Sequence, residues 1–131
     1  MMKVLYEILI PTRYGDGKMS PIRTRHHKQW DDRVQAISGG MTILSSARGK
    51  WTFKGVEYPE KVIPVRIMCT KPQMNRIVEI TMQHYRQKAV MYYVLSNEVF
   101  VVHAPEPKLT GNKYIDDPWL AQRYYPDGSR I

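Results

Sequence analysis

The residues best suited to chemistry are two acidic and two aromatic side chains that follow one another closely, and a glutamine further along the chain. Glu57 and Glu60 flank Tyr58 in an otherwise basic stretch, and Trp51 precedes them. A carboxylate beside aromatic rings suits a cationic ligand, through charge pairing and cation–π attraction worth about 0.5–2 kcal/mol per ring. With Gln87 added, the set predicts a ligand-binding site. The alternative is a packing contact around Tyr58 between two surface glutamates.

Other kinds of site are poorly supported by the sequence. It contains neither of the standard glycine-rich nucleotide-binding motifs, and no serine stands at a strand-to-helix elbow. Cys69 is the one cysteine, and its place in an apolar run predicts a structural thiol. His26, His27, Asp31 and Asp32 have the composition of a metal site, but His27 and Asp31 are four apart and form an ordinary helix-surface pair. We therefore expect no metal and no cofactor.

The candidate residues are positioned by a strand, a helix and a second strand across residues 60–95. Residues 62–69 form an apolar run typical of a strand. Thr70 and Gln73 make a T-x-x-Q capping box, and Pro72 lies in the first helical turn. The helix is expected to end near Gln87. Residues 90–95 are apolar on both faces, which predicts a strand in the centre of a sheet.

The remaining elements complete an α+β pattern. We expect a strand at residues 4–10, a helix at 24–38 ended by two glycines, a strand from 41 to 53, a hairpin turn at Lys54–Gly55, and a last strand at 99–102. This order predicts the ferredoxin-like class, an antiparallel sheet with two helices on one face and a hairpin extension. Residues 1–103 would form one domain. The proline- and aromatic-rich residues 104–131 would form an extended tail on their own or a neighbouring subunit.

Composition and charge limit the partners. The chain has 131 residues, a net charge of +8 and no apolar run long enough to span a membrane, so we expect a cytoplasmic protein. A basic patch in residues 13–33 could meet nucleic acid, a phosphate-bearing molecule or a protein, or form a solvated face. Nucleic acid is the least favoured of these, because no recognised motif is present. The patch consists of Arg13, Lys18, Arg23, Arg25, Lys28 and Arg33.

The run VRIMCTKPQMNRIVEITMQHYRQKAVMYYVLS, with Glu60 and Lys61 shortly before it, resembles the core of the phage S-adenosylmethionine lyases, formerly called hydrolases. That family has a strand of V-R-V-x-C type, a helix, and a Q-[DE]-x-V-[LM]-Y strand. The resemblance covers about residues 51–96. With Gly39–Gly40 and Met41–Thr42 upstream, the spacing is also similar to uncharacterised small phage and bacterial proteins.

The resemblance implies a ferredoxin-like homotrimer that binds its nucleoside substrate between subunits. It implies cleavage of S-adenosylmethionine to methylthioadenosine and homoserine lactone, with an anti-restriction role in the host cytoplasm. Glu60 would be the catalytic residue, pairing with the substrate ammonium group. Trp51, Glu57, Tyr58 and Gln87 would bind the substrate. Lys88 also falls in this set, but it stands where the family has an acidic residue and would repel a sulfonium if it pointed inward.

A second hypothesis comes from a different functional class. The basic patch and Lys88 are also consistent with a non-catalytic oligomeric module that binds or sequesters an anionic nucleotide. Its contacts would be Arg13, Arg23, Arg25 and Lys88. Such binding should weaken with salt and yield no product.

Overall fold

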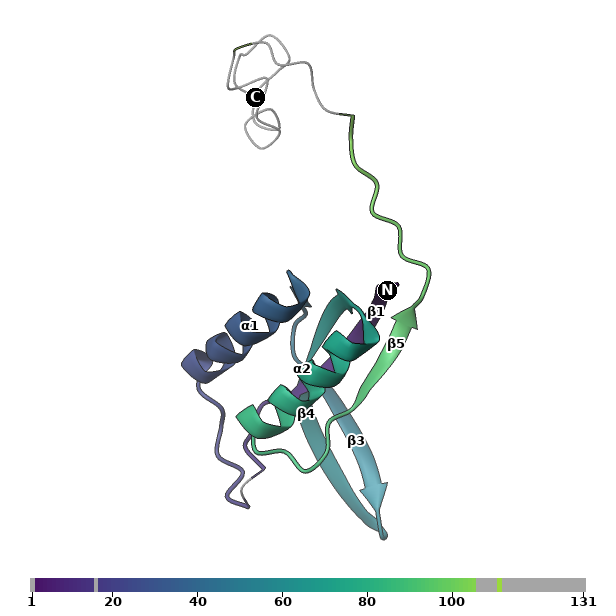
Figure 1. Cartoon of the computed structure of the whole chain (residues 1–131). Helices are drawn as coiled ribbons and strands as arrows, with labels where there is room; N and C mark the ends of the chain where they lie inside the picture. Colours follow the sequence, from purple (N-terminus) through teal and green to yellow (C-terminus); the bar gives the residue numbers. More distant parts are fainter. Residues whose placement is uncertain (1, 16, 106–110, 112–131) are drawn as a thin grey trace, which may run out of the picture. The chain divides into compact units, whose positions relative to one another are not determined.

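The computed structural model describes residues 2–15, 17–105 and 111. By its contacts the chain forms two units, Met1–Val99 and Phe100–Ile131, and every helix and strand that is described lies in the first (Figure 1). The predicted tail at 104–131 lies almost wholly outside the described residues, so its packing stays a prediction. The elements are β1 (Val4–Pro11), α1 (Thr24–Ser38), β2 (Thr42–Ile43), β3 (Ala47–Phe53), β4 (Val56–Cys69), α2 (Lys71–His84) and β5 (Tyr92–Ser96).

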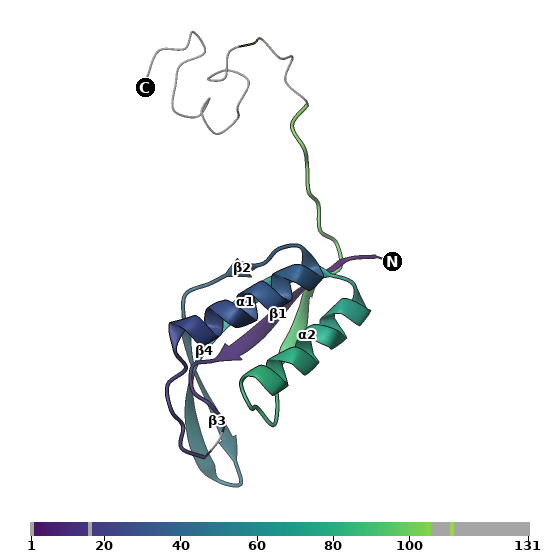
Figure 2. The same ribbon diagram turned by 60° about the vertical axis from the view of Figure 1, so that its left-hand side comes forward.

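The strands form one antiparallel sheet in the order β2-β4-β1-β5, with β3 also paired to β4. The first strand of the sequence is therefore central, with Val4 opposite Cys69 on one side and Glu7 opposite Tyr93 on the other. Both helices lie on the same face of this sheet (Figure 2). The α+β, ferredoxin-like prediction is confirmed. No described helix is long and apolar enough to cross a membrane.

The core lies between the helices and one face of the sheet. Because successive strand residues point to opposite faces, Tyr6, Ile8 and Ile10 of β1 all face the helices, and each is at most 3% exposed. Burying a large apolar side chain of this kind contributes roughly 1.5–3 kcal/mol. The same cluster includes Ile22, Trp30, Val34, Val65, Ile67, Cys69, Met74, Ile77, Ile80 and Tyr85.

Both helices begin and end close to where the sequence predicts. At the start of α2, the Thr70 hydroxyl accepts a hydrogen bond from Gln73 N (3.4 Å), and Gln73 Oε1 accepts one from Thr70 N (2.9 Å). These two bonds are the predicted capping box. At the end of α1, Gly39 takes a left-handed conformation (φ 86°), and its N–H donates to Gln35 O at 2.8 Å.

Three strand predictions were wrong. The strand predicted to be central is β5, which lies at an edge of the sheet and leaves Val94 55% exposed. The apolar residues of β5 are therefore partly exposed, and another protein surface could cover them. Residues 99–102 form no strand: the chain turns through hydrogen bonds between Ser96 Oγ and the Glu98 backbone, but does not pair back on β5. The strand predicted at 41–53 is interrupted at residues 44–46.

The helix-free face of the sheet carries a buried carboxylate that the sequence analysis missed. Glu7 is 7% exposed, and its register partners Arg66 and Tyr93 lie on either side of it. Arg66 Nε donates to Glu7 Oε1 at 3.1 Å, and the Tyr93 hydroxyl donates to Glu7 Oε2. The charge is thereby paired and hydrogen-bonded, as a buried carboxylate requires.

Candidate functional site

Most of the predicted site residues lie on the hairpin of β3 and β4, which extends past the end of β1 (Figure 1). β1 pairs with β4 only from Val62 onward, so residues 56–61 pair with β3 alone. The turn is tight because Lys54 (φ 50°) and Gly55 (φ 77°) both take positive φ. Both faces of the hairpin are therefore exposed.

One face of the hairpin combines aromatic rings with a carboxylate. Trp51 is opposite Tyr58, and Gly49 is opposite Glu60. Because residues two apart on a strand point to the same face, the side chains of Trp51, Tyr58 and Glu60 share one face of the hairpin. Val65 of β4 points into the core, so the even-numbered Tyr58 and Glu60 point to the helix-free face. The two rings lie 5.4 Å apart between centroids, and Trp51 is 54% and Tyr58 42% exposed. We call Trp51, Tyr58 and Glu60 the aromatic–carboxylate face.

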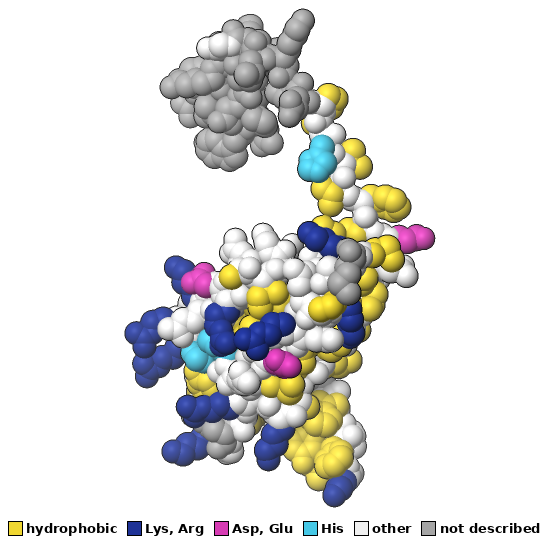
Figure 3. Space-filling model, in the orientation of Figure 1, with side chains coloured by type: hydrophobic (Ala, Val, Ile, Leu, Met, Phe, Trp, Pro, Cys, Tyr) yellow, Lys and Arg dark blue, Asp and Glu magenta, His cyan; other side chains and the backbone are white. Residues whose placement is uncertain are grey.

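The aromatic–carboxylate face continues toward the hairpin tip as an exposed apolar patch. Phe53 and Val56 are opposite each other and are 53% and 52% exposed. In Figure 3 this patch is the hydrophobic surface at the lower right. Contiguous apolar surface of this kind marks a binding surface more often than scattered exposed residues do.

Glu57 lies on the opposite face of the hairpin from Tyr58 and Glu60. Its Oε1 lies 3.7 Å from Lys50 Nζ, with both side chains largely exposed. Strand alternation places Pro59 and Lys61 on this same side. The structure therefore separates Glu57 from the other acidic residue of the predicted site.

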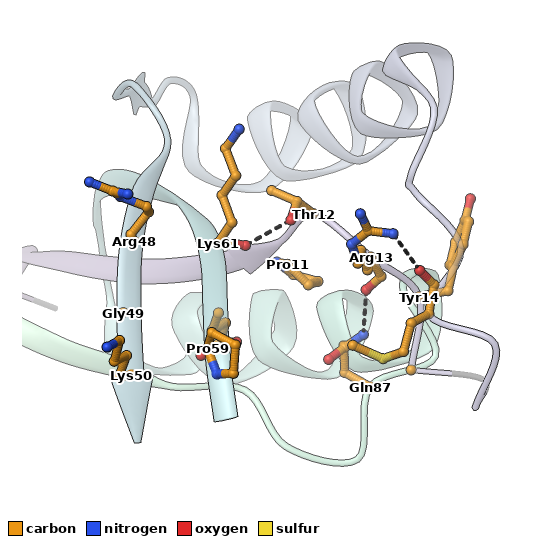
Figure 4. A pocket seen from close by; sticks show the side chains of 13 residues that line it. Pro11, Thr12, Arg13, Tyr14, Arg48, Gly49, Lys50, Pro59, Lys61 and Gln87 are labelled. Atoms are coloured by element: carbon orange, nitrogen blue, oxygen red, sulfur yellow. Dashed lines mark hydrogen bonds between the residues drawn. The ribbon is translucent and has the colours of Figure 1, made fainter. Parts of the chain in front are cut away.

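A pocket of about 590 Å³ lies where the hairpin meets the loop after β1 (Figure 4). Two hydrogen bonds hold its walls together. Thr12 Oγ1 donates to Lys61 O at 2.8 Å, and Gln87 Nε2 donates to Arg13 O at 3.3 Å. The loop itself is fixed by Arg13, which donates to Met19 O at 2.8 Å. The pocket is lined by residues 11–15 and 19, by 48–50 of β3, by 59–61 of β4, and by Gln87.

The pocket is strongly cationic. Arg13, Arg48, Lys50 and Lys61 line it, and the one acidic residue of the lining, Glu60, has its side chain on the opposite face of the hairpin by strand alternation. Lys50 is paired with Glu57, which lies outside the lining, whereas Arg48 and Lys61 have no ion-pair partner among the residues that the structure describes. The pocket therefore favours an anionic ligand.

The structure thus divides the predicted site residues between the two sides of the hairpin. Glu60 and Gln87 line one pocket, and Glu60 also shares a face with Trp51 and Tyr58. Lys88 is exposed and does not line the pocket. The cationic wall formed by Arg48, Lys50 and Lys61 was missed. The signal that could have found it is the alternation of basic residues along residues 48–50.

Of the residues proposed to hold an anionic nucleotide, Arg13 lines the pocket, but the others do not. Arg23 lines a separate cleft at the start of α1. Arg25 is exposed and lines neither cavity, like Lys88. The basic patch of the sequence is therefore not one continuous site.

A cluster of histidines joins the two helices near this second cleft. His26 and His84 stack with ring centroids 3.8 Å apart. Each donates from its Nε2 to the other's carbonyl, at 2.8 Å and 2.7 Å. Arg33 donates to His84 Nδ1 at 3.3 Å, which requires that nitrogen to be unprotonated. His84 is therefore neutral in this arrangement.

The environment of the cluster disfavours the protonated forms of His27 and His84. Burial lowers the pKa of His27, and the neighbouring His26 and His84 lower it further. Burial also lowers the pKa of His84. The hydrogen bond to the His26 backbone offsets part of this effect, and charge repulsion from His26 and Arg33 adds to it. Among the described residues, no group of three or more His, Cys, Asp or Glu side chains is placed to hold a metal ion.

Comparison with known proteins defines the class of fold. No family model matches the chain, and no curated protein matches its sequence. Solved structures match it, and most of those compared are CutA divalent cation tolerance proteins, with a phage lyase among them. The chain shares their fold.

Three of these structures illustrate the likeness. The CutA1 protein of Thermus thermophilus has a TM-score of 0.55 and 8% identity, covering 72% of this chain and 82% of that chain. CutA1 of Oryza sativa has a TM-score of 0.54 and 9% identity, covering 98% and 94%. A phage SAM lyase in complex with S-methyl-5'-thioadenosine has a TM-score of 0.52 and 13% identity, covering 72% and 81%. At such identities the likeness concerns the fold alone.

Proposed function

We propose that the protein is an S-adenosylmethionine lyase whose site is built on the aromatic–carboxylate face. The observation that carries this proposal is that Trp51, Tyr58 and Glu60 share one exposed face of the hairpin. Aromatic rings attract a sulfonium, and a carboxylate pairs with an ammonium group. S-adenosylmethionine carries both cations. The shared fold with a phage SAM lyase supports the same assignment.

The reaction suits a site without a nucleophile or a metal. The substrate's own carboxylate attacks its γ-carbon, a C–O bond forms, and the C–S bond breaks. The electron pair of the C–S bond stays on sulfur, so the sulfonium leaves as neutral methylthioadenosine and the other product is homoserine lactone. No proton has to be transferred. Glu60 would hold the ammonium group, and the rings of Trp51 and Tyr58 would hold the folded substrate away from water.

The proposal includes a homotrimer, because the site is incomplete in a single chain. The aromatic–carboxylate face lies open on the helix-free side of the hairpin, and a second copy could cover it. In a phage-infected cell, the reaction would remove the cofactor of host restriction–modification systems from the cytoplasm.

The test compares product formation by three proteins. The purified protein is incubated with S-adenosylmethionine, and methylthioadenosine is followed by chromatography for the wild type, Glu60→Gln and Glu79→Gln. Glu79 lies on α2 and pairs with Arg76, so its variant removes the same charge away from the hairpin. Product should form in the wild type and in Glu79→Gln, with a loss of about 10²-fold or more in Glu60→Gln. Absence of product in the wild type, or equal rates in all three proteins, would overturn the proposal.

A second candidate function is binding of an anionic nucleotide in the 590 Å³ pocket, favoured by its four cationic residues. Affinity should fall as salt rises, because exposed charges are screened. The double variant Arg48→Gln/Lys61→Gln should bind more weakly than the wild type, whereas Lys28→Gln on α1 should not. Equal binding by both variants would count against this function.

A further inference from the structure

A second cleft, of about 850 Å³, lies between the start of α1 and the end of α2. Arg23, just before α1, and Arg86, just after α2, line it together with Tyr14, Ser20, His26 and His84. It shares only Tyr14 with the 590 Å³ pocket. None of the residues of the aromatic–carboxylate face lines it.

The charges of this cleft are all of one sign. No carboxylate lines it. The side chains of Arg23 and Arg86 make no ion pair or hydrogen bond with any part of the chain that the structure describes. Arg23 and Arg86 are both exposed, so their guanidinium groups are free to bind a ligand in the cleft. Their fork of N–H donors matches the oxygens of a phosphate.

The histidines of the cleft cannot supply those donors. His26 and His84 each use Nε2 to hold the other's backbone carbonyl. His26 Nδ1 lies 3.2 Å from Gln29 Oε1, and His84 Nδ1 accepts from Arg33. The histidines therefore fix the wall, while Arg23 and Arg86, with the Ser20 hydroxyl, are left to face a ligand. The ring of Tyr14 packs 5.5 Å from that of His26 and gives the same cleft an aromatic side.

We propose that this cleft binds the phosphate group of an anionic small molecule, held between Arg23 and Arg86. The site is separate from both functions proposed above. The phosphate could belong to inorganic phosphate or to a nucleotide, and Tyr14 is placed to contact the base in the second case.

The experiment measures binding to the full chain by isothermal titration calorimetry at constant ionic strength. The probes are inorganic phosphate, adenosine monophosphate, and adenosine as the uncharged control. The proteins are the wild type, the double variant Arg23→Gln/Arg86→Asn, and Arg76→Gln. Asparagine is chosen because Arg86 has a positive φ (54°), which asparagine tolerates. Arg76 lies on α2 outside the cleft, and its variant removes the same kind of charge.

We expect phosphate or adenosine monophosphate to bind the wild type and Arg76→Gln, and to bind the double variant at least tenfold more weakly. Equal binding of both probes would identify the phosphate group alone as the ligand, and tighter binding of the nucleotide would identify a nucleotide. The proposal is overturned if neither probe binds the wild type, if the double variant binds as well as the wild type, or if adenosine binds as tightly as its monophosphate. Circular dichroism checks that each variant is folded. Cleavage of S-adenosylmethionine by the double variant should remain at the wild-type rate.

Discussion

At the scale of single residues, Gly15 shows how closely the loop after β1 approaches the end of α2. A Cβ built on Gly15 would lie 2.6 Å from Arg86 O and 3.1 Å from Gln87 Nε2. The carbonyl belongs to the backbone and cannot swing aside as a long side chain could. Glycine is therefore required here by space and not by φ, and it keeps Gln87 against the pocket.

Gly15→Ala should consequently lower the free energy of unfolding by about 1–3 kcal/mol, the range for an overpacked contact. The matched control is Gly40→Ala, because a Cβ at Gly40 meets nothing within 4 Å. Urea denaturation followed by circular dichroism measures both. Equal stability of the two variants would show that the loop yields without cost.

The residues show which parts of the site a sequence can reveal. Trp51, Tyr58 and Glu60 could be selected together because strand alternation and a short hairpin are local properties. His84 could not be paired with His26, since their contact depends on how two distant helices cross. Glu7 left a weak signal, a lone acidic residue in an apolar strand, but its partner Arg66 is identified only by the register of β1 and β4.

At the scale of elements, a hydrogen bond in the core joins α1 and α2, in addition to the contacts of the histidine cluster. The Trp30 indole N–H donates to Thr81 Oγ1 at 2.9 Å, and Thr81 in turn donates to Ile77 O at 2.6 Å. Both Trp30 and Thr81 are at most 1% exposed. The contact gives a hydrogen-bond acceptor to the indole N–H, the one polar group of the buried Trp30 side chain.

Thr81→Val keeps the shape of the side chain but leaves the indole N–H without an acceptor. We expect a loss of about 1–3 kcal/mol in the free energy of unfolding, the cost of an unsatisfied buried donor. Thr52→Val, on the exposed hairpin, should change stability little. Thermal or urea denaturation of the two variants decides, and a Thr81→Val protein as stable as the wild type would contradict the assignment.

The histidine cluster makes the pairing of the helices dependent on pH. The pKa of His27 and of His84 is lowered in the folded state, so below about 6.5 the unfolded chain binds more protons. The free energy of unfolding should therefore be constant just above that pH and fall as the pH drops from about 6.5 toward the folded values. Burial raises the pKa of Asp31, so the contribution of Asp31 to the pH dependence has the opposite sign.

Urea denaturation between pH 5 and 7.5 measures this dependence. A His27→Gln/His84→Gln variant should be less sensitive to pH over that range than the wild type. An identical slope in both proteins would show that other groups are responsible.

The elements also show why sequence prediction succeeded for both helices and failed for some of the strands. Both helices carry their boundaries in local residues, the capping box at Thr70 and Gln73 and the glycine at Gly39. A strand carries only its alternation, which states that two faces are apolar but not what covers them. Residues 90–95 and 99–102 were therefore assigned to the centre and to a final hairpin, although β5 lies at an edge and the later residues join no strand.

At the scale of the whole molecule, the exposed apolar surfaces of β5 and of the hairpin predict self-association. Val94 and Leu95 are 55% and 39% exposed, in addition to the patch around Phe53 and Val56. For the proposed trimer, analytical ultracentrifugation should give a mass about three times the 15.4 kDa of one chain. Phe53→Lys should reduce that mass if the hairpin forms the contact. A wild-type protein that sediments as a monomer at high concentration would exclude the trimer.

The central place of β1 has a consequence for how the protein is made. β1 leaves the ribosome before the other described strands, but its two sheet partners are β4 and β5, which are synthesised much later. Until β4 has emerged, Ile8 and Ile10 have no strand to pair with, because their partners are Val65 and Ile63. Such delayed long-range pairing slows folding and exposes apolar chain to aggregation. Proteolysis of stalled nascent chains of increasing length should reveal protection of β1 only after β4 is complete. The fold therefore assembles late in synthesis, and β1 has no sheet partner until then.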